Sequence, residues 1–281
     1  MRRSRPALIV VTAWLLFWPG SRPLEAADQP LPPAGAFLGM AVGTGITGDA
    51  QGLTDIQGIH NTIQAERLPV TENLQIYTRW SGTGTHTVVV EIREASTGTV
   101  LGDTRDELDF GAQRVTWFEH DFSGVTFGEA GTYLVEAALD GKTVATYALY
   151  VNASDQLSAE PAFVLSVPAE RGWVDAGGDA DVAGIFEYFS FAEFPATESF
   201  RVVTVWFSGD GSFSHSVRIS DSHGATVAQS RRGLLSAAGG RMTVSEDHFD
   251  SVAFPSAGVY TATIYLNDEA VTSFPLVIRG R

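Results

Sequence analysis

Apolar and polar positions alternate along most of this 281-residue chain, and the alternation predicts β-strands. Two stretches with the same spacing show it: Leu74, Ile76 and Trp80, and Phe200, Val202 and Trp206. In each stretch the apolar side chains share one face of an extended segment, which is typical of a half-buried strand. No window of a dozen residues has the 3.6-residue period of an amphipathic helix. The pattern therefore predicts an all-β protein.

Short turn sequences separate the predicted strands. Residues 81–84 and 208–211 carry two glycines each, and Asp140-Gly141 lies between strands predicted over 132–139 and 143–151. Glycine, asparagine and aspartate accept the positive φ that tight hairpin turns require. Many short strands joined by such turns favour antiparallel sandwiches of about seven to nine strands each.

The chain contains an internal duplication. At an offset of 126 residues Phe37 falls on Phe163 and Trp80 on Trp206, and after a one-residue insertion Tyr133 falls on Tyr260. We therefore predict two β-sandwich copies, over residues 36–152 and 162–281, joined by a polar linker at 153–161.

Both copies contain a Gly-x-Tyr sequence where a late strand begins. The sequences Gly131-Thr-Tyr133 and Gly258-Val-Tyr260 resemble the tyrosine corner of immunoglobulin-like domains, with Trp80 and Trp206 as the core tryptophans. The cysteine positions of true immunoglobulin domains are occupied by Val135 and Ala262. The chain thus resembles tandem bacterial immunoglobulin-like β-sandwich domains of uncharacterised function. That resemblance implies an envelope or extracellular role and no chemistry.

The N-terminus has the pattern of a secretory signal peptide. Arg2, Arg3 and Arg5 precede an apolar stretch over residues 7–18, and a small-residue exit follows at Ala26. The apolar stretch has 12 residues, whereas a spanning helix needs about 20. We predict a signal peptide over 1–26, a leader over 27–35 and a periplasmic or secreted protein without stable membrane insertion after cleavage near Ala26.

The charge of the chain argues against several partners. It has 33 acidic and 18 basic residues, a net charge of −15, and Lys142 is its one lysine. Removal of residues 1–26 takes away four arginines and one glutamate, so the charge falls from −15 to −18. Affinity for nucleic acid comes from clustered Lys and Arg, so nucleic acid and anionic membranes are disfavoured. With no cysteine, the chain has neither disulfides nor a lipoprotein anchor.

Three aspartates in the second copy form a candidate metal site. Asp175, Asp179 and Asp181 alternate with glycines and alanines and offer the hard oxygen ligands that calcium prefers. Three side chains are fewer than the six to eight ligands that calcium takes. The alternative is a solvated acidic loop, and no other cofactor is expected.

Other candidate motifs favour structural roles. Residues 43–48 match the dinucleotide pattern GxGxxG, but no helical pattern follows, so we interpret them as a loop between strands. His86 and His215 are equivalent and are expected at the core rim. His120 and His248 differ by one position in register, which places them on opposite faces of equivalent strands.

Two classes of function follow from these patterns. The second copy has an aromatic run that the first copy lacks, comprising Phe186, Tyr188, Phe189, Phe191 and Phe194. This run indicates either a strand buried against the other domain or an exposed aromatic binding patch. We expect an exported, non-catalytic binding or assembly module whose partner is a protein or carbohydrate of the cell envelope or extracellular space. A secreted hydrolase acting on envelope or extracellular polymers is the alternative, although the chain has no Gly-x-Ser-x-Gly elbow and no HExxH motif.

Overall fold

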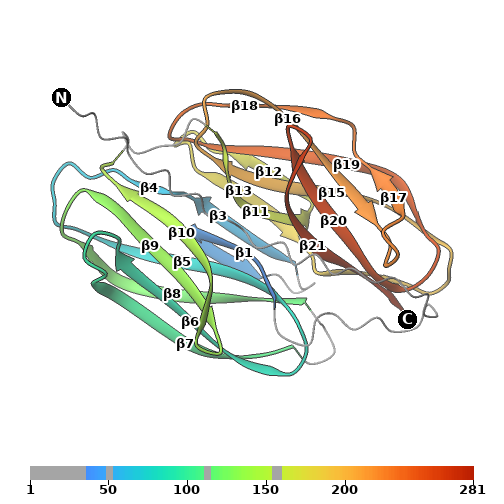
Figure 1. Cartoon of the computed structure of the whole chain (residues 1–281), viewed down its shortest axis with the longest axis horizontal. Coiled ribbons are helices and arrows are strands. Elements are labelled where there is room, and N and C mark those ends of the chain that lie inside the picture. Colours follow the sequence, from blue (N-terminus) through green and yellow to red (C-terminus); the bar gives the residue numbers. More distant parts are fainter. Residues whose placement is uncertain (1–35, 49–52, 111–114, 154–159) are drawn as a thin grey trace, which may run out of the picture.

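The structure is a computed structural model that describes residues 36–48, 53–110, 115–153 and 160–281. Every regular element in these ranges is a strand, as the alternation predicts. The two copies lie side by side, the first in blue to green and the second in yellow to red (Figure 1). The predicted signal peptide, the leader and most of the linker over 153–161 lie outside the described residues.

The first copy consists of two sheets. The three-stranded sheet has the order β1 (Ala36–Gly43), β5 (Val70–Ser81) and β8 (Val115–Phe127). The five-stranded sheet has the order β4 (Thr62–Ile63), β10 (Lys142–Val151), β9 (Gly131–Leu139), β6 (Thr85–Glu94) and β7 (Val100–Asp109). This strand order is that of an immunoglobulin-like sandwich.

The second copy repeats this arrangement. Its three-stranded sheet has the order β11 (Ala162–Ala169), β15 (Ala196–Phe207) and β19 (Met242–Phe254). Its second sheet has the order β14 (Tyr188–Phe191), β21 (Glu269–Gly280), β20 (Gly258–Leu266), β16 (Gly211–Ser220) and β17 (Thr226–Gln229), and β18 (Gly233–Ala237) also pairs with β16.

One strand pair in each copy corrects the expectation of purely antiparallel sandwiches. β4 pairs with β10 in parallel, and β14 pairs with β21 in parallel. In each copy the chain leaves its first sheet and runs along the edge of the second in the same direction as the last strand. The remaining pairs are antiparallel.

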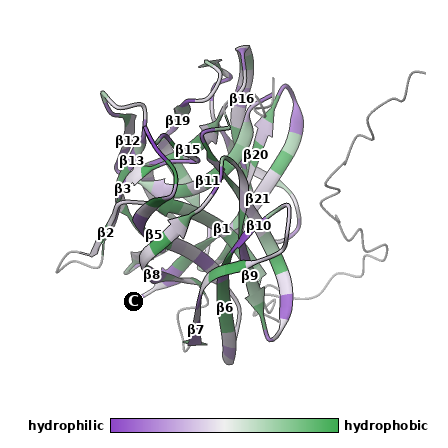
Figure 2. Cartoon of the chain, turned by 90° about the vertical axis from the view of Figure 1, so that its left-hand side faces the viewer, coloured by the Kyte–Doolittle hydropathy of each residue, from purple (hydrophilic) through white to green (hydrophobic). Residues whose placement is uncertain are grey.

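A tryptophan lies at the centre of each sandwich. Trp80 and Trp206 are fully buried. The indole N–H of Trp80 donates to Thr78 Oγ1 at 2.8 Å, and that of Trp206 donates to Ser245 Oγ at 3.1 Å. Alternating side chains pack around these rings, and the alternation of hydropathy along the strands can be followed in Figure 2. Each tryptophan therefore buries a large apolar surface without leaving its N–H unpaired.

The tyrosine-corner positions show the same geometry in both copies. Tyr133 donates its hydroxyl hydrogen to the carbonyl of Glu129 at 2.9 Å, and Tyr260 donates to that of Ser256 at 3.0 Å. Both tyrosines are buried. The hydroxyl thus ties the start of the strand to the preceding turn.

A further sheet joins the two copies, and the sequence patterns do not predict it. Its order is β12 (Arg171–Val174), β13 (Ala180–Ile185), β3 (Thr54–Ile59) and β2 (Gly45–Gly48). β13 of the second copy pairs antiparallel with β3 of the first. These four strands bring the count above the expected seven to nine strands per copy.

The seam between β3 and β13 has pseudo-twofold symmetry. The amide of Gly184 donates to Asp55 Oδ1 at 2.7 Å, and the amide of Gly58 donates to Asp181 Oδ1 at 2.8 Å. These two bonds exchange equivalent residues of the duplication. Gly58 has φ +60° and Gly184 has φ +69°, and a Cβ at either position would lie under 2.5 Å from a neighbouring side chain. The positive φ, together with the close approach of Thr44 to Gly58 and of Glu170 to Gly184 within each copy, therefore favours glycine at both positions.

The hydrophobic core also continues from one copy into the other. One cluster of buried residues contains Met40, Val42 and Ile56 of the first copy together with Leu165 and Val203 of the second. Because apolar side chains of both copies pack in one cluster, the copies share a hydrophobic core and are not two independent domains joined by a linker.

Candidate functional site

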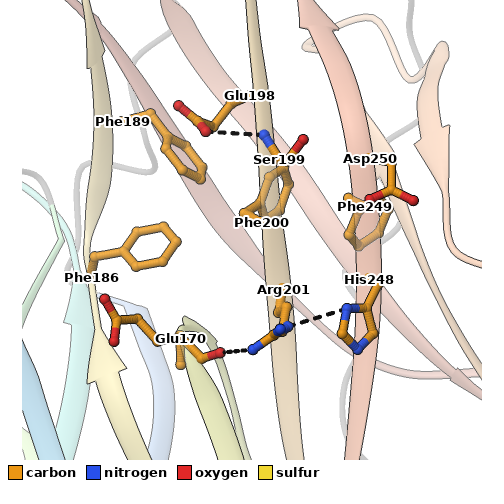
Figure 3. A pocket seen from close by; sticks show the side chains of 11 residues that line it. Glu170, Phe186, Phe189, Glu198, Ser199, Phe200, Arg201, His248, Phe249 and Asp250 are labelled. Atoms are coloured by element: carbon orange, nitrogen blue, oxygen red, sulfur yellow. Dashed lines mark hydrogen bonds between the residues drawn. The ribbon is translucent and has the colours of Figure 1, made fainter.

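A cavity of about 510 Å³ opens beside the three-stranded sheet of the second copy (Figure 3). Its size falls within the range of small-molecule sites, about 300–1,000 Å³. Four phenylalanines form its apolar part: Phe186, Phe189, Phe200 and Phe249. Its polar part consists of Glu170, Glu198, Ser199, Arg201, His248 and Asp250. Apolar surface with a few convergent polar groups is the usual composition of a ligand site.

The phenylalanines pack against one another in a continuous layer. Phe200 and Phe249, adjacent on β15 and β19, are buried and stack with ring centroids 5.1 Å apart. Phe189 lies 5.0 Å from Phe200, and Phe186 lies 4.9 Å from Phe189. Phe186 and Phe189 are half-buried and present ring surface to the cavity. Phe200 and Phe249 are buried and form the inner part of the same layer.

Arg201 is held in place by groups on β19 and on the turn between β11 and β12. It donates from Nε to His248 Nδ1 at 3.2 Å, and its Nη1 donates to the carbonyl of Glu170. Glu246 Oε2 lies 4.0 Å from Arg201 Nε and 3.4 Å from His248 Nε2. The guanidinium is therefore oriented, and its charge already has an anionic neighbour.

Carboxylates gather at the opposite end of the cavity. Figure 3 shows Glu198 and Asp250 at one end and Arg201 and His248 at the other. Glu198 Oε1 accepts the amide hydrogen of Ser199 at 3.0 Å. Within the described part of the chain, neither Glu198 nor Asp250 has an ion pair with a basic side chain. The cavity thus has an acidic end, an aromatic middle and a charge-compensated arginine end.

The first copy holds one wall of this cavity in position. Phe186 follows β13, which pairs with β3 of the first copy. The next residue, Glu187, accepts two hydrogen bonds from Arg79, at 3.0 Å from Nε and 2.9 Å from Nη2. Arg79 is fully buried and also lies over the ring of Phe274. The cavity belongs to the second copy by its lining, but one wall depends on contacts with the first.

The duplication places different residues at the equivalent positions of the first copy. His60 replaces Phe186, Leu74 replaces Phe200 and Gln75 replaces Arg201. Gln75 donates to Glu119 Oε1 at 2.6 Å and to Asp121 Oδ1 at 2.9 Å, and its own oxygen accepts the amide hydrogen of Ile46. In the first copy these polar groups satisfy one another, and the aromatic layer is missing.

The candidate calcium residues have other partners in the structure. Asp175 Oδ1 accepts the amide hydrogens of Gly178 and Asp179 at 2.8 and 3.0 Å, and Asp181 Oδ1 accepts that of Gly58. Burial, with the neighbouring carboxylates, raises the pKa of Asp179. Over the residues that the structure describes, no three metal-ligating side chains gather at one point. Asp175 shapes a turn and Asp181 stabilises the seam.

The structure corrects the expectation that His86 and His215 are equivalent. Val88 pairs with Leu139, and His215 pairs with Leu266, the equivalent of Leu139, so His215 occupies the position of Val88. His86 Nδ1 lies 2.7 Å from Asp140 Oδ2, and this hydrogen bond raises the pKa of His86 above its ordinary value. His215 is buried, and its Nδ1 lies 3.2 Å from Asp247 Oδ2. His120 is buried whereas His248 is exposed, as their difference in register predicts.

Sequence reasoning identified part of this cavity. The aromatic run included Phe186 and Phe189, and both line the cavity. Nothing in the local sequence of Arg201 or Glu198 indicates a site, and His248 is distinguished only by its difference in register from His120. The duplication itself offers one signal of the site. At equivalent positions, Gln75 and Asp121 of the first copy are replaced by Arg201 and His248 in the second copy. No helix long and apolar enough to span a membrane occurs within the described ranges.

These features define a tandem β-sandwich protein with a pocket on its second copy. A family of unknown function, DUF6941, matches residues 41–152 and 172–279. The match covers more than half of the chain, so the chain belongs to that family. Its two segments agree with the internal duplication. Comparison with curated proteins gives no match.

Three of the solved structures that match this chain are distant likenesses. A BSP domain of a biofilm-associated protein is 13% identical, with a TM-score of 0.22, over 73% of this chain and 27% of that one. A Bifidobacterium dentium β-glucuronidase is 10% identical, with a TM-score of 0.28, over 72% of this chain and 39% of that one. Red sea bream transglutaminase is 8% identical, with a TM-score of 0.23, over 77% of this chain and 30% of that one. This chain spans well under half of each, and these likenesses carry no functional argument.

Proposed function

We propose that this protein is an exported, non-catalytic binding module whose ligand is a carbohydrate of the cell envelope or extracellular space. The observation that carries the proposal is the cavity with half-exposed phenylalanine rings beside oriented polar side chains. Aromatic rings pack against the apolar face of a sugar ring, and polar side chains at the rim bond its hydroxyl groups. The signal-peptide pattern of residues 1–26 supports export to the periplasm or beyond.

The sequence difference between the two copies supports a different role for each copy. The second copy has the aromatic layer, whereas the first has Leu74 and His60 at equivalent positions. The first copy contributes Arg79 and Asp55 to the contacts that hold the cavity wall. We assign the first copy a supporting role and the second copy the binding role.

The proposal is tested by co-sedimentation of the full chain with insoluble envelope polysaccharides. Phe186→Ala removes a half-exposed ring from the cavity, and we expect it to weaken binding about tenfold. Tyr188→Ala is the matched control, because this exposed aromatic lies two residues away and packs under Arg279 rather than lining the cavity.

Equal binding by both variants and the unmodified chain would contradict the proposal. Release of soluble reducing ends from the polysaccharide by the unmodified chain, abolished by Glu198→Gln, would instead favour the secreted hydrolase. Because Glu198 lines the cavity, the same sample distinguishes the two functions.

A further inference from the structure

The charged side chains around the cavity disfavour anionic sugars. This inference rests on the proposed carbohydrate-binding function. Glu170, Glu198 and Asp250 contribute three carboxylates to the lining, against one guanidinium, Arg201. Arg201 has Glu246 as its anionic neighbour at 4.0 Å. The lining therefore carries excess negative charge. An anionic sugar entering it would meet repulsion from the carboxylates with little free cationic charge to offset it.

The acidic excess lies at one end rather than all round. Glu198 and Asp250 come from neighbouring strands, β15 and β19, and lie at the same end of the cavity (Figure 3). Among the described residues neither has a Lys, Arg or His partner. The two carboxylates can therefore accept charge-assisted hydrogen bonds from a cationic group of a ligand.

The aromatic layer favours a cation in the same place. A cation within about 6 Å of an aromatic ring face is attracted by the negative potential of that face. Phe189 lies tilted against Phe200, with ring centroids 5.0 Å apart, and Phe200 is two positions after Glu198, so the rings lie next to the acidic end. An ammonium group at this end would contact carboxylate oxygens on one side and ring surface on the other.

The size and the far end of the cavity decide what carries the ammonium group. A volume of about 510 Å³ exceeds the needs of a small quaternary ammonium ion and suits a ligand of one or two sugar rings. At the far end, the oriented guanidinium of Arg201 offers a donor for neutral hydroxyl groups. We infer that the cavity binds an amino sugar with a free ammonium group, placed at the end of the cavity where Glu198 and Asp250 lie.

Calorimetric titration of the full chain at mildly acidic pH tests this assignment with three disaccharides of the same linkage. They are the β-1,4-linked disaccharides of glucosamine, N-acetylglucosamine and glucose, of which the first alone carries ammonium groups. We expect the glucosamine disaccharide to bind at least about tenfold more tightly than the other two, because a charged hydrogen bond contributes more than a neutral one. This preference should shrink at high salt.

Variants locate the effect. Glu198→Gln with Asp250→Asn should remove the preference for glucosamine and leave weak binding of all three sugars. Glu72→Gln is the matched control, because Glu72 is the equivalent of Glu198 in the first copy, and it should bind like the unmodified chain. Far-ultraviolet circular dichroism of each variant verifies that it is folded.

Each remaining outcome decides the assignment. Equal binding of the three disaccharides, lost in Phe186→Ala, would overturn the amino sugar and leave the carbohydrate-binding function intact. Nα-acetyl-lysine amide keeps a free side-chain ammonium group but has no sugar ring. If it binds as tightly as the glucosamine disaccharide, the sugar is overturned in favour of a protein side chain. If none of these probes binds but envelope polysaccharide still does, the amino sugar is overturned while the binding function stands.

Discussion

The two copies share a strand order, and each has a histidine–aspartate pair between its two sheets. At one equivalent interior position, the first copy has the histidine of its pair and the second copy has the aspartate. On β8 of the first copy the position holds His120, whose Nδ1 lies 3.0 Å from Asp106 Oδ2. On β19 of the second copy it holds Asp247, whose Oδ2 lies 3.2 Å from His215 Nδ1. In both copies the partner comes from the opposite sheet. The sandwich therefore accepts a polar pair between its sheets from either side, provided that its atoms are bonded.

The two pairs differ in how far their partners are buried. The side chain of Asp106 is 35% exposed, whereas that of His215 is 9% exposed. His120 also contacts Thr78 Oγ1 through Nε2 at 3.0 Å, and Asp247 accepts the hydroxyl hydrogen of Ser230 at 2.5 Å. Removing His120 from the first pair or Asp247 from the second therefore leaves different groups without a hydrogen-bond partner.

The largest effect is expected from Asp247→Ala. This change leaves buried His215 and Ser230 without their acceptor, and losing one partner of a buried pair costs about 3–5 kcal/mol. His120→Ala should cost less, about 1–3 kcal/mol, because the carboxylate of Asp106 can turn to water. Urea denaturation at neutral pH measures both changes in the free energy of unfolding.

The exposed His248 provides the control for this pair of variants, and His248→Ala should change stability by less than about 0.5 kcal/mol. Losses of equal size in Asp247→Ala and His120→Ala would show that the burial of the partner does not govern the cost.

A smaller effect is expected from pH. Burial lowers the pKa of His120 below its ordinary value of 6.5, partly offset by Asp106. The unfolded chain therefore binds a proton more readily than the folded chain as pH falls from about 6.5. Stability that is present at neutral pH should be lost through this window, until the folded-state pKa is passed.

Thermal melts over this pH range test the role of His120. The fall in melting temperature should be shallower in His120→Gln than in the unmodified chain, since the variant has no imidazole at this position. Parallel curves for the two proteins would assign the pH dependence to other groups.

Much of the fold could be predicted from sequence because its signals are local. The hairpin residues Asp140 and Gly141 have φ of 50° and 81°, as a tight turn requires. The seam between β3 and β13 could not be predicted, because these short, glycine-containing strands pair across 126 residues of sequence. The cavity was missed as a whole for a similar reason, since Arg201 and His248 meet through strand pairing.

A small effect, of similar size in the two copies, is expected at the tyrosine corners. Tyr133→Phe and Tyr260→Phe each remove a hydrogen bond to a backbone carbonyl and keep the ring, and Tyr133→Phe also removes the acceptor of the Glu129 amide at 3.4 Å. Each should cost about 0.5–1.5 kcal/mol, measured by urea denaturation. A clearly larger loss in one variant would mean that the corner has taken on a different role in that copy.

The reciprocal bonds of the seam, Asp55 with Gly184 and Asp181 with Gly58, are of the isologous kind that relates the subunits of a twofold dimer. In such a dimer both subunits must keep the same surface, since one gene encodes them both. A covalent connection replaces association that depends on protein concentration with a fixed, high effective concentration. The halves are then free to diverge outside the seam, as the equivalent residues Gln75 and Arg201 have done, while each half keeps the other as its permanent partner.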